Sequence, residues 1–399
     1  MRKSSRLINW LISVALAAMV TPALADTAAT PAATASPTAA PTPVVSVDGL
    51  VDAYYTYNFT NSSKGVNGMG NNGTFFNTTD DAFSLALAEV DVKAVMGSAT
   101  GFVALVGGSS NGSLALNPGI DFLQAYAAYT AGQFTLTGGR FSTWMGNEVI
   151  ESNGNWNYSR SLLFWYTIPL WHQGISVAYT TPDSKFGITG YITNGWNNAS
   201  TSGYYDVGKT YGLQLKFAPD ANNTVLLNGI FGSNGAFAGS VANFDQGDSH
   251  YVAELVASTN VSDKFSLALD AEYGGISPSS EQLTTASFWG AALYGKYQIS
   301  SDWSLALRLE ELESSDSWLG IYGQQSASTN NPYVEGREAT LTISHNLNSN
   351  LLFRLEGRYD YALTGGTADD PTATPAVPGP FAAGQGSQFT GSGSIVFNY

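Results

Sequence analysis

The side chains with the widest catalytic repertoire are scarce in this chain of 399 residues. It contains three histidines, His172, His250 and His345, and no cysteine. Histidine is the usual base beside a nucleophile, and imidazoles and thiolates are common zinc ligands. The three histidines are far apart and fall on connections or strand ends, where we expect polar rim positions. The sequence therefore predicts no catalytic residue, no metal site and no cofactor.

Two other motifs have chemically suggestive residues. Asp80 and Asp81 are adjacent in "GTFFNTTDD", but paired acids in a polar segment are more typical of a solvated loop, or of a weak cation site, than of an acid/base pair. The stretch "GSNGAFAG" is rich in glycine but has no following lysine or helix, so it does not predict a phosphate-binding loop.

Charge narrows the range of partners. The chain has 31 acidic and 16 basic residues and a net charge of −15, which argues against binding nucleic acid, whose phosphates need a basic surface. Only 12% of residues are charged and 13% are aromatic, a low charge content for a surface that is exposed to water throughout. The acidic excess suits an aqueous interior.

The elements that must position these residues alternate with a period of two. In "VVSVDGLVDAYYTYNF", residues 44–59, the odd positions are apolar and the even positions include Asp48 and Asp52. The same alternation recurs in "AEVDVKAVM", "WSLALRLEE" and "LLFRLEGRYDY". One apolar and one polar face is typical of a half-exposed β-strand.

The connections between these strands alternate between short and long. The short ones are turn-rich, at 97–100, 131–133, 181–184, 219–223, 262–263, 300–302 and 346–350. The long ones are polar, at about 60–81, 111–120, 145–171, 196–208, 234–249, 276–285, 315–334 and 364–385. This pattern predicts an all-β fold, a transmembrane antiparallel β-barrel of about 16 strands with short periplasmic turns and long extracellular loops.

The two ends of the chain fit an exported barrel. Residues 1–25 have the basic start, apolar stretch and small-residue end of a signal peptide, with an uncleaved anchor as the alternative. A Thr/Ala/Pro-rich periplasmic linker, 26–43, precedes the barrel, 44–399. We expect the terminal "SIVFNY" to close the barrel on the first strand, because an open edge in lipid would leave backbone groups unpaired. Its aromatics Phe397 and Tyr399 look like the signal read by the outer-membrane assembly machinery.

The stretches "GLVDAYYTYNF" and "GNWNYSRSLLFWYTIPLWHQGISVAY", with the terminal "FNY", resemble the β-barrel porins called porin-2 or OmpL-like. The resemblance runs over the whole barrel. It implies an outer-membrane channel for small solutes and names no particular solute. No functional residue is carried over from it.

A barrel of this strand number is too wide for its wall side chains to fill, which favours passive diffusion of small hydrophilic solutes and ions through a water-filled lumen. The alternation predicts which charged side chains line that lumen. The strongest candidates for the lumen wall are Asp48, Asp52, Glu89, Asp91, Lys296, Arg308, Glu310, Arg354, Glu356 and Arg358.

The connection 145–171 is the candidate constriction. Its second half, "LLFWYTIPLW", is too apolar for an external surface, so we expect it to fold inward and bury Phe164, Trp165 and Trp171. The polar half, with Glu148, Glu151 and Arg160, would then lie across the lumen. Its acids would face the wall cations, and the excess of acids predicts a mild cation preference.

Other interpretations stay open. The barrel could be a plugged structural or adhesin-type protein, or an outer-membrane enzyme with Ser–His or Asp–His groups on one wall. A cap or subunit contact is the alternative for 145–171, and a secreted β-sandwich for the fold. The partners expected are outer-membrane lipid, the assembly machinery and small solutes, without nucleic acid, and the chain could be a monomer or a homotrimer.

Overall fold

The structure is a computed structural model that describes residues 42–60, 74–114, 116–197, 209–233, 249–277, 286–315, 334–364 and 386–399. The proposed signal peptide and nearly all of the proposed linker lie outside these residues. The described part contains sixteen strands. They are β1 (Val44–Asn58), β2 (Ala82–Met96), β3 (Ala99–Gly107), β4 (Ile120–Ala131), β5 (Phe134–Ser142), β6 (Trp171–Thr180), β7 (Phe186–Thr193), β8 (Thr210–Phe217), β9 (Asn223–Ser233), β10 (Ser249–Ser262), β11 (Phe265–Ser277), β12 (Ala286–Gln298), β13 (Trp303–Ser314), β14 (Val334–Asn346), β15 (Leu351–Thr364) and β16 (Ser387–Asn398).

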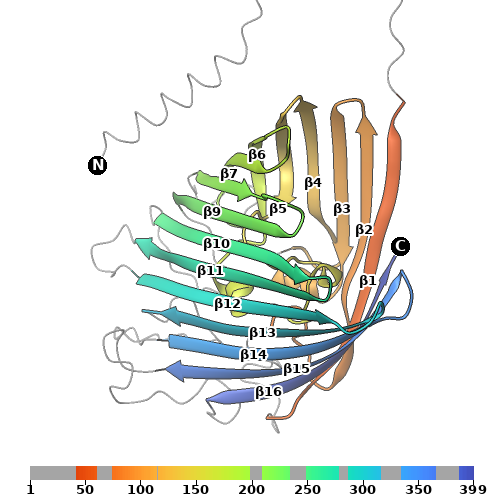
Figure 1. Cartoon of the computed structure of the whole chain (residues 1–399), viewed down its shortest axis with the longest axis vertical. Helices are drawn as coiled ribbons and strands as arrows, with labels where there is room; N and C mark the ends of the chain where they lie inside the picture. Colours follow the sequence, from red (N-terminus) through yellow and green to blue (C-terminus); the bar gives the residue numbers. More distant parts are fainter. Residues whose placement is uncertain are drawn as a thin grey trace, which may run out of the picture. The chain divides into compact units, whose positions relative to one another are not determined.

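These strands form one closed barrel in which each strand is antiparallel to its neighbour in the sequence (Figure 1). The barrel closes where β16 pairs with β1, with Val51 opposite Phe397. The N–H of Gly49 donates to the backbone oxygen of Tyr399 at 3.2 Å, and the N–H of Tyr399 donates to the backbone oxygen of Gly49 at 3.1 Å. The sequence prediction of a sixteen-strand barrel whose last strand closes on its first is therefore confirmed.

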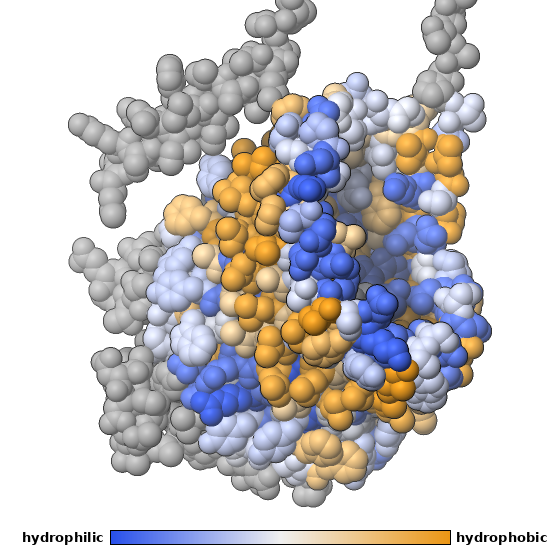
Figure 2. Space-filling model, viewed as in Figure 1, coloured by the Kyte–Doolittle hydropathy of each residue, from blue (hydrophilic) through white to orange (hydrophobic). Residues whose placement is uncertain are grey.

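The two faces of each strand differ in the way that the alternation predicts. On β13 the outward Leu307 and Leu309 are 43% and 46% exposed, whereas the intervening Arg308 is fully buried and Glu310 is 6% exposed. Apolar side chains gather over the outer surface of the strands in Figure 2. In lipid such exposure is favourable, because the surrounding solvent is itself apolar.

The alternation is weakest between about residues 100 and 145, and the structure gives the reason. The register of β3 and β4 shifts between Ala104 and Leu105. Since one extra residue in a strand reverses which side chains point inward, a bulge breaks the period-two pattern in the sequence.

The connection between β5 and β6, residues 143–170, is named here the inner loop. It contains a 3-10 turn, η2 (Ser152–Gly154), and a short helix, α3 (Leu162–Tyr166), and another short helix, α2 (Ser110–Ser113), lies between β3 and β4. The prediction that the connection includes Trp171 is wrong by one residue, because Trp171 already pairs with Ser142 as the first residue of β6. None of the helices in the described ranges is long and apolar enough to cross a membrane.

Candidate functional site

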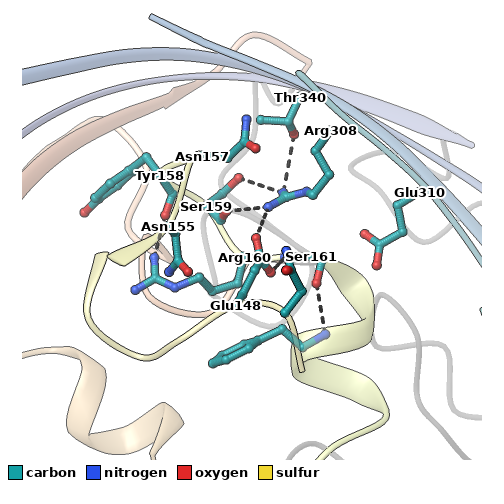
Figure 3. A network of polar contacts seen from close by, with 12 residues as sticks. Glu148, Asn155, Asn157, Tyr158, Ser159, Arg160, Ser161, Arg308, Glu310 and Thr340 are labelled. Atoms are coloured by element: carbon teal, nitrogen blue, oxygen red, sulfur yellow. Dashed lines mark hydrogen bonds and ion pairs between the residues drawn. The ribbon is translucent and has the colours of Figure 1, made fainter. Parts of the chain in front are cut away.

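Arg308 on β13 holds the centre of the inner loop (Figure 3). Its guanidinium donates to Glu148 at 2.6 Å and to the backbone oxygen of Ser159 at 2.6 Å. It also bonds Glu338 on the neighbouring strand β14 at 2.5 Å. Arg308 lies on the inner face of the barrel, so these contacts place the loop inside it.

The helix α3 begins on a carboxylate of the same strand. The backbone N–H groups of Leu162 and Leu163 donate to Glu310 at 2.6 and 2.7 Å. The hydroxyl of Ser161 accepts the N–H of Phe164 at 3.0 Å. The first N–H groups of a helix have no partner within the helix and carry partial positive charge, so a wall carboxylate at this end stabilises α3 where it meets the wall.

The first half of the inner loop is held by strand β15. The carboxylate of Glu356 accepts the N–H groups of Tyr158 and Ser159 at 2.6 and 2.9 Å. The guanidinium of Arg354 donates to the backbone oxygens of Ser152 and Asn155 at 2.7 and 2.9 Å. A loop without a sheet partner leaves its backbone groups unpaired, and the charged wall side chains pair them here.

The start of the loop is attached to two further strands. The N–H of Gly146 donates to Glu254 on β10 at 2.7 Å, and the N–H of Asn147 donates to Asp270 on β11 at 2.9 Å. Gly146 has φ of +91°, a region that favours glycine because a Cβ there is strained. Attachments from β10 to β15 thus follow the loop over most of its length.

The apolar half of the loop packs between the barrel wall and the segment before β2. The ring of Trp165 stacks on Phe75, with centroids 3.5 Å apart, and Phe164 meets Phe76 edge-on at 6.1 Å. On the other side Leu163 approaches Gly290 of β12 so closely that a Cβ at that position would clash. Burying a Leu or Phe side chain contributes about 1.5–3 kcal/mol, so this packing contributes substantially to holding the loop.

The structure changes the expected role of the three loop charges. Glu148 and Arg160 are each 5% exposed, and Glu148 pairs directly with Arg308. Arg160 donates to the backbone oxygens of Val149, Tyr158 and Ile150, within its own loop. The prediction that Glu148 faces Arg308 across open lumen is therefore wrong, because the pair is in contact and buried.

Glu151 keeps partial access to solvent. Burial raises the pKa of its carboxyl above the ordinary value, and Arg160 opposes that rise. For Arg160 burial lowers the pKa of the guanidinium, against the attraction of Glu148. Of the three loop charges, Glu151 is the one that solvent partly reaches.

The ten predicted wall residues all lie on the inner face and divide into two groups. Those bonded to the inner loop are Asp52, Arg308, Glu310, Arg354, Glu356 and Arg358. Asp52 accepts the hydroxyl of Tyr158, and Arg358 donates to the backbone oxygen of Arg160. The other four are Asp48, which is exposed, Asp91 and Lys296, which are half-exposed, and Glu89, which is buried. The arginines expected to face water therefore bind the loop instead.

The histidines lie at strand ends, as expected, but two are not polar rim residues. His172 and His250 are 0% and 1% exposed. The ring of His172 stacks on Trp144 at 4.3 Å, and its Nε2 lies 3.2 Å from the hydroxyl of Thr143. His345 is half-exposed and stacks on Trp303 at 4.0 Å.

Sequence reasoning missed the contacts that hold the loop in place. It predicted that Glu310 and Glu356 point inward, but not that they accept loop N–H groups about 150 to 200 residues away. It also missed the role of Phe75 and Phe76. Their apolar character in an otherwise polar connection was the one signal that could have indicated packing inside the barrel.

A closed antiparallel barrel of sixteen strands, with an apolar outer face and a long connection inside, defines an outer-membrane barrel of the porin type. Comparison of sequences then identifies the family. The chain belongs to the family described as "Putative beta-barrel porin-2, OmpL-like", which it matches over residues 44–399. Among curated proteins, no sequence matches significantly.

Solved structures of outer-membrane proteins share the fold. OmpT of Vibrio cholerae is 11% identical with a TM-score of 0.57, covering 90% of this chain and 98% of its own. The outer-membrane channel DcaP of Acinetobacter baumannii is 12% identical with a TM-score of 0.57, covering 90% and 97%. An anion-selective porin from Comamonas acidovorans is also 12% identical with a TM-score of 0.57, covering 90% and 100%. At these identities the similarity establishes the architecture alone.

Proposed function

We propose that the protein gives passive diffusion of small hydrophilic solutes and ions across the outer membrane, and that the inner loop narrows the path. The observation that carries this proposal is the row of bonds from Glu254, Asp270, Arg308, Glu310 and Glu356 to the loop. A segment held inside a barrel by its wall reduces the cross-section open to water.

Selectivity would come from the charges that water can reach. Asp48, Asp91 and Glu151 supply negative charge, and Lys93 and Lys296 supply positive charge on the same inner surface. Among the described wall residues the buried acids outnumber the buried bases, which would make the potential in the lumen negative. Because clefts with walls of low dielectric concentrate such a field, we propose a mild preference for cations.

Single-channel conductance in a planar bilayer tests the proposal. Deletion of residues 148–157 removes Glu148, which pairs with Arg308, and the segment held by Arg354, and should raise conductance above that of the intact protein. A matched control deletes ten residues, 320–329, from the connection between β13 and β14 and should leave conductance close to the intact value. Reversal potentials in a salt gradient measure selectivity, and Glu151→Gln should reduce the cation preference. Equal conductance in all three proteins would place the constriction outside the inner loop.

A plugged structural barrel is the second candidate, and one observation favours it. Phe75 and Phe76 pack on the apolar half of the inner loop from the side opposite the wall, which adds a further layer of side chains inside the barrel. If the intact protein inserts into the bilayer without conducting, whereas the deletion of residues 148–157 conducts, the plugged barrel is the better description.

The partners and the location follow from the same proposal. We propose that the signal peptide, residues 1–25, is removed near Ala25, that the outer-membrane assembly machinery reads Phe397 and Tyr399, and that the apolar outer face contacts lipid. One of the similar structures is a trimer form of OmpT from Vibrio cholerae. We propose a homotrimer for this chain as well, and native mass spectrometry of the detergent-extracted protein would test it. We also propose that the barrel is not an enzyme.

A further inference from the structure

Most acids of the inner wall are paired with a cation or bonded along the inner loop. Glu338 lies 2.5 Å from Arg308, and Asp360 lies 2.8 Å from Arg358. Glu310 and Glu356 each accept two loop N–H groups. Buried carboxylates are costly unless they are compensated in such ways.

Three neighbouring acids, which we name the acidic trio, have no lysine or arginine paired with them in the described ranges, although two of them also accept a loop N–H group: Glu254 on β10 with Asp270 and Glu272 on β11. Glu254 and Glu272 are directly opposite each other in the register, and Asp270 is two residues away on the same face. Each offers a carboxylate oxygen, and these oxygens all lie within 4.8 Å of one another. The three residues are 2–4% exposed. Among the described residues, no ion pair to a lysine or arginine reaches them.

Several oxygens at this place have no hydrogen-bond partner within the described part of the chain. These are both carboxylate oxygens of Glu272 and the Oδ1 atom of Asp270. Ala292 on the next strand, β12, lies opposite Asp270, and Tyr294 is the next inward residue of that strand. The buried hydroxyl of Tyr294 also has no hydrogen-bond partner in the described part of the chain. A buried acceptor without a donor costs about 1–3 kcal/mol or more when charged. Three carboxylates with oxygens within 4.8 Å of one another, two of which keep oxygens without a donor among the described residues, have the chemistry that a cation coordinates.

We propose that the acidic trio binds one divalent cation of the oxygen-preferring class, Ca²⁺ before Mg²⁺, at the start of the inner loop. Ca²⁺ takes six to eight oxygen ligands in a flexible arrangement, and Glu272 and Asp270 supply unpaired oxygens, with Glu254 and water completing the shell. Because Glu254 and Asp270 also accept the N–H groups of Gly146 and Asn147, the cation would hold the loop to the wall. The site stands independently of whether the barrel conducts.

A second acidic group on the outer face gives a built-in contrast. Glu311, Glu313 and Glu335 also bring carboxylate oxygens within 4.8 Å of one another. Arg337 pairs with two of the three, with its guanidinium 2.8 Å from Glu311 and 2.5 Å from Glu335. The acidic trio has no such arginine, so the two groups make opposite predictions for cation binding.

Direct binding tests the proposal on the full-length mature chain in detergent, stripped with a chelator. Calcium chloride and magnesium chloride are titrated by calorimetry, and Tb³⁺ luminescence excited through nearby aromatic rings reports the site. We expect one Ca²⁺ per chain, displacement of Tb³⁺ by Ca²⁺, and a melting temperature that rises with Ca²⁺. Glu272→Gln and Asp270→Asn should each weaken binding at least about tenfold, or about 1.4 kcal/mol. Glu311→Gln should leave binding unchanged.

Heat-modifiable migration on gels shows which variants fold. If Glu272→Gln does not fold, the binding measured for Asp270→Asn decides the test. Absence of binding in the folded, stripped wild-type protein would overturn the proposal. So would loss of binding in Glu311→Gln with binding retained in Glu272→Gln. If Glu272→Gln is more stable than the wild type at every Ca²⁺ concentration, protons and not a cation compensate the trio, and the proposal is wrong.

Discussion

Replacing Arg308 with methionine tests how much a buried ion pair contributes to the stability of this barrel, compared with an exposed one. The Arg308 side chain is inaccessible to water and joins Glu148 to Glu338. Removing one partner of a buried ion pair typically costs about 3–5 kcal/mol, because the remaining charges stay buried without compensation. Glu148 retains the N–H of Ser161 at 2.7 Å, and Glu338 retains Arg358 at 3.6 Å. We therefore expect the lower end of that range, about 3 kcal/mol, in the free energy of unfolding.

Arg337 provides the matched control on the adjacent strand. It also contacts two carboxylates, but its side chain is 54% exposed. Exposed ion pairs contribute about 0–1 kcal/mol, so Arg337→Met should change the free energy of unfolding by no more than that. The assay is urea unfolding of the folded barrel in phospholipid vesicles, followed by tryptophan fluorescence.

A double-mutant cycle with Glu148→Gln completes the test. If the loss of Arg308 leaves the carboxylate of Glu148 buried without a cation, the double variant should recover part of the lost stability, with a coupling energy of about 1–3 kcal/mol. Single-channel conductance of Arg308→Met should rise or become noisier as the loop loosens. Equal stability losses in Arg308→Met and Arg337→Met would refute the argument that burial of the pair decides its contribution.

Three further outcomes are expected. Peptide tags inserted at Asn198 and Asn331, which lie outside the described residues, should be labelled on intact cells. A tag at Asp220, in the short turn before β9, should not be labelled, and labelling there would reverse the proposed topology. Deletion of Phe397–Tyr399 removes the end of the ladder between β16 and β1, opposite Gly49–Val51, and should abolish membrane assembly. Normal heat-modifiable migration of the truncated chain would contradict this. Burial raises the pKa of Glu151 above its ordinary value of 4.5, so the folded protein binds that proton more tightly than the unfolded chain. Wild type should therefore lose stability relative to Glu151→Gln as pH rises above 4.5, and the difference should be constant below it. A difference that is independent of pH over the whole range in unfolding titrations would contradict the burial of this carboxyl.

The amino-acid sequence was enough to predict the barrel. Period-two alternation is a local property, since each residue's face depends only on its position along one strand, so Arg308 and Glu310 could be placed on the inner face without any contact being known. Strand number followed from the connections, and closure followed from the requirement that no sheet edge remain open in lipid. The local pattern weakened around the register shift between Ala104 and Leu105.

The contacts made by the inward charges could be seen only in the folded barrel. Nothing near Glu310 in the sequence indicates that it accepts the N–H groups of Leu162 and Leu163, because that contact depends on the path of a loop about 150 residues away. Alternation gives the direction of a side chain but not what occupies the space in front of it. For that reason Arg308 was predicted to face water and instead holds the inner loop, and the acidic trio became visible only when β10 and β11 were paired in register.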